Sequence, residues 1–470
     1  MPGPHLCLIG DSLLDVDWEG DVRRVCRDAP APVVDSPVEH IRAGGAALAA
    51  TLAAAAGARV TLVTALSVDS DGRRLAGLLT DAGIDAIDLG LDGPTPVKLR
   101  LRSGGQSLAR VDRGCDPVVL PGPWSAAAGD AVAVADAVLI SDYGRGLAAL
   151  PEVVIGMPAA GEGPPVVWDP HSLGPRPPAA TLVTPNVGEA LDLLGEAASP
   201  IGVAAVPWLI ELAGAVAASL GTAVALTTGE RGAVLAEPGA LPVVVPTRPA
   251  RGDACGAGDA LAVHAALALA TGASRREAVE AGVAGARSYL AGRVPGGTPP
   301  ARRAAVACDP DGTVVALAPP AGEGPAAAVR RAGGVVVAAG GCFDVLHAGH
   351  VQLLEHARSL GDHLVVLVNG DASVRRLKGP GRPLNPVADR VAVLRSLACV
   401  DEVMAFDEDT PSRALRALRP HLFVKGADYE GADLEERQVM ARWGGQVVLV
   451  PLVDGRSTSR LIDSAAAAGA

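Results

Sequence analysis

Gly341-Cys342-Phe343-Asp344-Val345-Leu346-His347-Ala348-Gly349-His350 decides the fold of the last third of this chain. The apolar residues 335–339 before it predict a buried strand, and the amphipathic residues 351–360 after it predict a helix. This order places both histidines at the start of a helix, where free backbone N–H groups and the helix dipole favour a phosphate. We therefore expect Gly341 to Asp344 to bind a nucleotide and His347 and His350 to be catalytic residues.

Further residues downstream suit the same site. Lys378 lies in a basic stretch, 375–379, and Lys425 ends an apolar stretch that predicts a strand. Ser457 and Thr458 precede a predicted helix start, where hydroxyls and amides can bind phosphate. We expect Lys378 to be catalytic and Lys425, Ser457 and Thr458 to bind the nucleotide. Metal ligation by the two histidines is the alternative, but no third His, Cys or carboxylate cluster accompanies them, so no protein-bound metal is expected.

A second signature is Arg251-Gly252-Asp253-Ala254-Cys255-Gly256-Ala257-Gly258-Asp259, followed by a nearly uncharged stretch, 260–270. The first part predicts a turn and the second a buried helix. Glycines at the start of such a helix let the backbone amides of Gly256, Ala257 and Gly258 approach a phosphate closely. An aspartate beside them can take a proton from a hydroxyl, so we expect Asp259 to be a catalytic base.

Alternating apolar and helical stretches run along most of the chain and predict an α/β fold. Such alternation is typical of a doubly wound, largely parallel sheet with helices on both faces. Residues 31–42 and 95–112 break it with period-2 patterns that predict exposed antiparallel strands. The predicted domains are residues 1–317 and 334–470, with a Pro/Gly-rich linker at 318–333. The second domain should be a Rossmann-like fold with its site at the carboxyl ends of the strands.

Composition limits the classes of function. The net charge of −12 argues against nucleic acid or an anionic membrane as a partner. The seven cysteines are scattered without paired spacing, and the N-terminus lacks a basic secretory region, so a reducing cytoplasm fits. Residues 201–229 carry one charge, Glu211, but Pro207, Gly214 and Gly221 interrupt them; they predict a buried helix and strand in a soluble protein.

The first domain resembles the ribokinase family of sugar kinases in several motifs that occur in the family order. They are Gly-Ala-Gly-Asp at 256–259, Gly10-Asp11 with Asp15, the pair Gly44-Gly45, Asn186-x-x-Glu189, and the turn with Thr227 and Gly229. The resemblance implies that Asn186, Glu189, Thr227 and Gly229 bind ATP and that Asp11, Asp15, Gly44 and Gly45 bind the sugar. It also implies that Asp259 deprotonates a sugar hydroxyl, which attacks the γ-phosphate of ATP with Mg²⁺ present.

Two features bear on the identity of the sugar. The resemblance implies that the strands at 31–42 and 95–112 form a small β lid over the sugar. Lys98, Arg100 and Arg110 lie on these strands, where they either form a solvated hairpin or grip a phosphate already on the sugar. Leu48 and Cys255 stand where the family often has Asn and Thr. These departures affect contacts to the sugar more than the proposed base.

The second domain resembles nucleotidyltransferases, and the whole chain resembles bifunctional heptose 7-phosphate kinases and heptose 1-phosphate adenylyltransferases. This implies attack by a sugar phosphate on the α-phosphorus of ATP with release of pyrophosphate. Two alternatives stay open: a cytidylyltransferase that activates another sugar or polyol phosphate, and a nucleotide-binding regulatory protein with one silenced half. The expected partners are a sugar phosphate and ATP, and a homodimer is compatible with the sequence.

Overall fold

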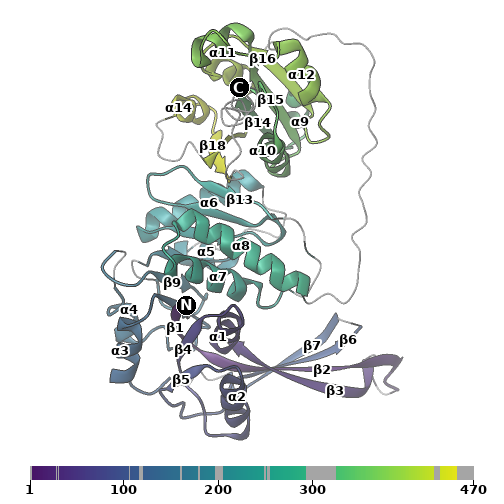
Figure 1. The fold of residues 1–470 in the computed structure, drawn as a ribbon. Coiled ribbons are helices and arrows are strands. Elements are labelled where there is room, and N and C mark those ends of the chain that lie inside the picture. The colour runs from purple at the N-terminus through teal and green to yellow at the C-terminus, as the bar shows by residue number, and fades with distance from the viewer. Residues whose placement is uncertain are drawn as a thin grey trace, which may run out of the picture. The chain divides into compact units, whose positions relative to one another are not determined.

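The computed structural model describes residues 3–451 except 28, 30, 105, 116–119, 159–160, 178–179, 196–204, 248–249, 251–253, 293–323 and 428–433. The chain forms two compact units (Figure 1). The first comprises residues 1–200, 213–238 and 247–295, and the second comprises residues 201–212, 239–246 and 296–470.

The first unit contains a sheet with strand order β12-β11-β10-β9-β8-β1-β4-β5, in which only β12 is antiparallel to its neighbour. This confirms the largely parallel sheet that the sequence predicts. The strands are β1 (His5–Gly10), β4 (Arg59–Thr64), β5 (Asp85–Asp88), β8 (Ala137–Ser141), β9 (Val166–Asp169), β10 (Leu182–Val183), β11 (Val224–Thr227) and β12 (Ala233–Ala236).

Helices connect these strands. They are α1 (Ala46–Ala55), α2 (Ser70–Asp81), α3 (Ala126–Ala133), α4 (Pro151–Val154), α5 (Val187–Leu194), residues 213–220 of α6 (Val206–Leu220), α7 (Ala257–Ala270) and α8 (Arg275–Gly292), with a 3₁₀ turn at Gly229–Arg231. Small residues let α7 pack closely: a Cβ at Gly285 of α8 would lie 2.3 Å from the His264 ring of α7. The alanine-rich composition therefore builds a dense core around the sheet.

The lid is a separate sheet in the order β3-β2-β6-β7, which extends away from the main sheet of this unit (Figure 1). Its strands are β2 (Ser12–Val25), β3 (Pro32–Gly45), β6 (Val97–Ser103) and β7 (Gln106–Arg113). Residues 12–17 of β2 are buried and most of the later ones are exposed. The strands predicted at 31–42 and 95–112 are present and β7 is exposed as predicted, but β6 is partly buried, with Val97 and Leu99 in the core. The sequence did not indicate β2, whose two halves have different environments.

The second unit has a parallel sheet in which β16-β15-β14-β17-β18 are neighbours. The strands are β14 (Val336–Gly341), β15 (His363–Asn369), β16 (Glu402–Phe406), β17 (Leu422–Gly426) and β18 (Gln446–Val450), and this unit also contains β13 (Val243–Val245). The helices are α9 (Pro325–Arg331), α10 (Ala348–Ser359), α11 (Asp371–Lys378), α12 (Val387–Arg395), α13 (Ser412–Leu418) and α14 (Glu435–Ala441).

Two sequence expectations gain detail here. The segment expected to be a linker contains α9, whose Ala326 and Ala327 are buried, Ala326 in the core with Phe423 and Met440. Residues 318–323 lie outside the described residues. No helix among the described residues is long and apolar enough to cross a membrane. The nearly uncharged stretch at 201–229 instead contains α6 and β11, as the sequence predicts from residue 206 onward.

Candidate active sites

Asp259 lies in the first turn of α7, and it is 6% exposed. The helix follows a turn in which Gly256 has φ +88°, a conformation that favours glycine. A Cβ at Gly256 would also lie 2.5 Å from the Tyr289 hydroxyl. Gly256 and Gly258 stand at this helix N-terminus, where the sequence predicts a phosphate site, while the Ala257 amide donates to the Ala254 carbonyl within the turn at 3.0 Å. Residues 251–253 of the motif lie outside the described residues.

Burial raises the pKa of Asp259 to about 6, and the charge of Asp15 adds to the rise. A hydrogen bond from Tyr143 and the charge of Lys98 act in the opposite direction. The Tyr143 hydroxyl donates to both carboxylate oxygens of Asp259, at 2.9 Å and 3.0 Å. A carboxylate with this pKa is ionised at pH 7 and basic enough to accept a proton.

The predicted nucleotide-binding residues of the first domain are brought together. Asn186 caps α5 and pairs with Thr227, which ends β11, in an isolated bridge. Asn186 and Glu189 form a reciprocal capping box, in which each side chain accepts the other residue's backbone N–H. Gly229 follows with φ +64°. The Asn-x-x-Glu motif therefore has a structural role, and Glu189 also lines a cleft of about 220 Å³.

Three carboxylates lie near this cleft and the base. Burial raises the pKa of Asp142 to about 7, and burial together with the charge of Asp259 raises the pKa of Asp169 well above its ordinary value. Glu189 adds to both shifts. The Oδ2 atom of Asp142 is buried without a hydrogen-bond partner. The described residues contain no group of three or more ligands able to hold a metal ion by themselves. The carboxylates of Asp142, Asp169 and Glu189 instead suit Mg²⁺ that is carried by nucleotide phosphates and keeps its own water ligands.

The predicted sugar-side residues surround Asp15. The carboxylate of Asp15 accepts a hydrogen bond from Arg100 at 2.7 Å, and both side chains are largely buried. A Cβ at Gly44 would lie 2.8 Å from Asp15 Oδ2 and 2.4 Å from Leu13 Cδ1. A Cβ at Gly45 would lie 2.4 Å from the carbonyl oxygen of Asp11. The glycine pair therefore allows β3 to lie directly against the start of β2.

Asp11 and the basic lid residues have other contacts. Asp11 accepts backbone N–H groups from Tyr143, Arg145 and Leu147, so its carboxylate anchors the loop after β8. Arg110 is exposed and forms a two-bond pair with Asp112. Lys98 forms no ion pair within the described ranges, and its Nζ lies 5.1 Å from the centre of the Tyr143 ring.

The second unit brings the two histidines together at the start of α10. His347 caps the helix, His350 lies in its first turn, and their rings stack with centroids 3.9 Å apart. Phe343, at φ +46°, places its ring 5.3 Å from His350. Burial, then the charges of His347 and Lys378, lower the pKa of His350 to about 4. Lys378, at the end of α11, is therefore close enough to His350 to influence the ionisation of its imidazole.

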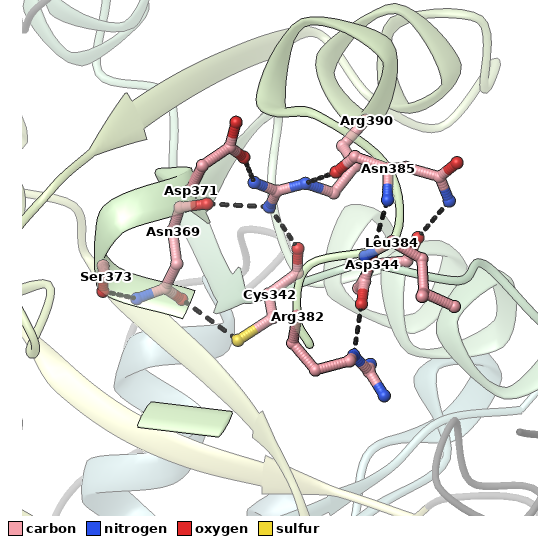
Figure 2. Close-up of polar contacts among 9 residues, drawn as sticks. All are labelled: Cys342, Asp344, Asn369, Asp371, Ser373, Arg382, Leu384, Asn385 and Arg390. Atoms are coloured by element: carbon pink, nitrogen blue, oxygen red, sulfur yellow. Dashed lines mark hydrogen bonds and ion pairs between the residues drawn. The ribbon is translucent and has the colours of Figure 1, made fainter. Parts of the chain in front are cut away.

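Arg390 holds the surroundings of this site together (Figure 2). It is 2% exposed, and its guanidinium donates to the carbonyl oxygens of Cys342, Asn369 and Asn385 and to the Asp371 carboxylate. The carbonyls of Cys342 and Asn369 lie at the carboxyl ends of the neighbouring strands β14 and β15. Arg390 therefore fixes the loop that leads to the histidines against the start of α11.

Asp344 forms a second connection in Figure 2. Its carboxylate accepts a hydrogen bond from Arg382 at 2.5 Å and from the backbone N–H groups of Leu384 and Asn385. Asn385 donates in turn to the Asp344 carbonyl. Asp344, predicted to bind nucleotide, thus ties its loop to residues 382–385. Gly341 ends β14, and a Cβ there would lie 3.2 Å from the Phe343 ring.

Lys425 is the remaining predicted residue of this site that the structure describes. It lies in β17 and forms an ion pair with Glu436 at 2.9 Å, in which both side chains are largely buried. Ser457 and Thr458 lie outside the described residues. Tyr143, Asp142, Asp169 and Arg390 were missed by sequence reasoning. Arg390 had a usable signal, because it shares the helical stripe of Val387, Val391 and Leu394 and so falls on a buried face.

Comparisons with known proteins match both halves. A model of the pfkB family carbohydrate kinases matches residues 165–290, and a model described as Cytidylyltransferase-like matches residues 338–458. Among solved structures, a ribokinase from Arabidopsis thaliana is 22% identical, with a TM-score of 0.47 over 61% of this chain and 93% of that one.

Curated relatives match nearly the whole chain. The Bifunctional protein HldE of Streptomyces coelicolor is 47% identical, covering 98% of this chain and 96% of the relative. Proteins of the same name from Azorhizobium caulinodans and Erwinia tasmaniensis are 38% and 35% identical; the alignments cover 98% and 97% of this chain, and 98% and 95% of the relatives. Because this similarity spans both sites in one chain, the protein joins a ribokinase-like carbohydrate kinase to a nucleotidyltransferase and belongs to the HldE family of bifunctional proteins.

Proposed function

We propose that this enzyme catalyses two steps of ADP-heptose synthesis. The first domain phosphorylates O1 of D-glycero-β-D-manno-heptose 7-phosphate with ATP, and the second transfers an adenylyl group from ATP to heptose 1-phosphate, releasing pyrophosphate. The observation that carries the proposal is 47% identity to an HldE protein over 98% of the chain. The proposal is also supported by Asp259 and by the pair His347 and His350, because both sites place suitable catalytic side chains at the start of a helix.

In the kinase reaction, Asp259 takes the proton from the O1 hydroxyl, and the oxygen attacks the γ-phosphorus of ATP while ADP leaves. The amides of residues 256–258 stabilise the transferring phosphoryl group. Mg²⁺ neutralises charge on the ATP phosphates when it is bound, and the buried carboxylates of Asp142, Asp169 and Glu189 would hold it through its waters. Asn186, Thr227 and Gly229 form the nucleotide side of the site.

The phosphate already on the sugar is bound first of all by Lys98. Arg100 and Arg110 were expected to share this task, but their guanidinium groups pair with Asp15 and Asp112. Asp11, Asp15, Gly44 and Gly45 shape the rest of the sugar pocket. We expect Lys98→Ala to raise the KM for heptose 7-phosphate about tenfold, the size of one charge-assisted contact. An unchanged KM in a steady-state kinase assay would remove Lys98 from substrate binding.

In the second reaction the nucleophile is a phosphate oxygen that is already anionic, so no base is required. His347 and His350 stabilise the crowded α-phosphate, and Lys378 stabilises the departing pyrophosphate. Gly341, Cys342, Phe343 and Asp344 form the turn that receives the nucleotide, with Lys425, Ser457 and Thr458 at its other side. His350, with a pKa of about 4, is neutral at pH 7 before a ligand binds, and the negative charge of bound ATP would raise that pKa toward its ordinary value.

We also propose the coarse organisation of the molecule. Residues 1–317 form the kinase domain, 318–333 join the two parts and 334–470 form the transferase. A cytoplasmic location fits the described cysteines, all of which are free thiols. A homodimer is compatible with these features, and sedimentation velocity of the purified chain would decide it.

The proposed function is tested with Mg²⁺, heptose 1-phosphate and either ATP or CTP, following pyrophosphate release and product mass. ADP-heptose formed with strong preference for ATP is the expected result. Turnover with CTP alone would instead support the cytidylyltransferase alternative, which the description of the matching family model favours. A parallel assay with heptose 7-phosphate and ATP tests the kinase half, and no turnover in either assay would contradict the assignment.

A further inference from the structure

Tyr143 occupies a position at the kinase base that the motifs did not reveal. It lies in the loop after β8, at the carboxyl edge of the sheet, and its hydroxyl donates to both oxygens of Asp259. The three backbone hydrogen bonds to Asp11 fix this loop. A fixed loop delivers the hydroxyl to the carboxylate in one geometry.

The Tyr143 hydroxyl is a donor that keeps its proton. Burial and the charges of Asp259 and Asp169 hold the pKa of its phenol well above the ordinary value of 10. An ionised carboxylate offers about four lone-pair positions, so the hydrogen bond leaves room for a sugar hydroxyl. Tyr143 can therefore stay in place while Asp259 accepts the proton from the sugar.

The ring of Tyr143 is held by two further side chains. Lys98 Nζ lies 5.1 Å from the ring centre, and His171 stacks with the ring at a centroid distance of 6.5 Å. Lys98 comes from the lid strand β6, whereas His171 follows β9. Tyr143 thus connects the base to a residue proposed to bind the sugar phosphate.

We propose that Tyr143 is a positioning residue of the kinase reaction, whose hydroxyl holds the Asp259 carboxylate in one orientation and stabilises its ionised form. The inference rests on the proposed role of Asp259 as the base. In the reaction, the O1–H bond breaks, its proton moves to Asp259, and the O1–phosphorus bond forms as the bond to ADP breaks. Tyr143 keeps its own proton throughout. The other charges that act on Asp259 come from Asp15 of β2 and Lys98 of β6, and Asp169 of β9 is coupled to it.

Tyr143→Phe removes the hydroxyl and keeps the ring between its neighbours. We expect the acid limb of the kinase pH profile to move upward by about one pH unit, because a hydrogen bond to a charged acceptor is lost. The kcat at pH 7 should fall about tenfold, with little change in the KM for heptose 7-phosphate. Adenylyl transfer by the same preparation reports that the protein is folded and should be unaffected.

Thr80→Val is the control for loss of a hydroxyl, because Thr80 is exposed on α2 and its hydroxyl donates to the Ala76 carbonyl within that helix at 2.9 Å. Its pH profile should coincide with that of the wild type. A Tyr143→Phe profile that also coincides with the wild type, or a loss confined to KM, would overturn the inference. Asp259→Asn separates the two proposals: kinase activity retained there refutes the base itself, whereas an inactive Asp259→Asn with an unshifted Tyr143→Phe refutes only the role of Tyr143.

Discussion

Burial disfavours the charged form of the central groups in both sites, but these groups are carboxylates in the kinase site and imidazoles in the transferase site. In the kinase site burial raises the pKa values of carboxylates, so that Asp259 reaches about 6 and Asp142 about 7. In the transferase site burial and neighbouring positive groups lower the pKa of His350 to about 4. The nucleophiles explain the difference. A sugar hydroxyl must lose a proton and needs a base, whereas a sugar phosphate is already anionic and needs cations and donors around the group it attacks.

Removing one central group from each site tests whether the two sites work independently. Asp259→Asn should lower kinase turnover about 10³-fold and leave adenylyl transfer intact, since a general base typically contributes this much. His350→Ala should do the reverse by a similar factor. Both activities are measured on one preparation, so each serves as the folding control for the other. Cross-effects in both directions would show that the two sites are not independent.

Arg390 tests whether the transferase site depends on its buried support. Arg390→Met leaves three carbonyls and one carboxylate without their shared donor, and should destabilise the second domain by about 3 kcal/mol. Chemical denaturation monitored by adenylyl transfer measures this, with kinase activity as the reference. The control is Arg413→Met, because Arg413 is exposed and pairs only with Glu408, a contact worth below about 1 kcal/mol. Equal losses in the two variants would count against Arg390.

The buried carboxylate of Asp142 should lower the free energy of unfolding at neutral pH. Its pKa is raised from the ordinary 3.8 to about 7, so the folded state binds the proton more tightly than the unfolded state. Stability from this group is therefore present at low pH, falls between about pH 4 and 7, and stays low above. Asp142→Asn should raise the free energy of unfolding by about 1 to 3 kcal/mol at pH 8.

The same variant should lower kinase activity, and the stability gain should disappear near pH 4. The measurement is denaturant unfolding at the two pH values. A variant that is less stable than the wild type at pH 8 would contradict the cost assigned to Asp142, and would mean that the carboxylate has a favourable partner in solution.

The smallest expected effect is proton uptake in the transferase site. Because His350 is neutral at pH 7 and a polyphosphate favours its charged form, ATP binding should raise its pKa. Affinity for ATP should then increase up to tenfold per pH unit toward acid, within the range between the free and bound pKa values. Calorimetry in buffers of different ionisation enthalpy counts the protons. In Asp259→Asn, where the kinase site is inactive, the uptake should persist, whereas in His350→Ala it should vanish.

Local motifs predicted much of this fold. The strands β1, β8, β9 and β15 and the helix starts of α7 and α10 follow from apolar runs and glycine turns, because those signals lie within a few neighbouring residues. The strand β2 could not be predicted from such a signal, because its buried residues 12–17 and its exposed later residues follow different sequence patterns. The composition predicted a core of small side chains without showing how its helices pack. The close approach of α7 and α8 depends on Gly285 of α8 facing the His264 ring of α7, which is a contact between two helices.

The sites divide in the same way. Asp259, His347 and His350 could be found because their positions at helix starts are local. Asp142 and Tyr143 follow β8 and Asp169 ends β9, and the hydrogen bond of Tyr143 and the charge of Asp169 reach Asp259 of α7 only once the sheet has formed. Lys425 and Arg100 were predicted as ligand-binding residues, but their carboxylate partners Glu436 and Asp15 could not be assigned from sequence spacing.

The lid has a consequence for enzyme redesign. The strand β2 has its first residues within the body of the first unit and its later residues in the exposed sheet, and β6 and β7 lie beside it. The side chains proposed to meet the sugar from this sheet therefore lie on strands that are distant in sequence from α7 and its base. A library confined to residues 101–113 would therefore vary the lid while Lys98, Tyr143 and Asp259 keep their contacts.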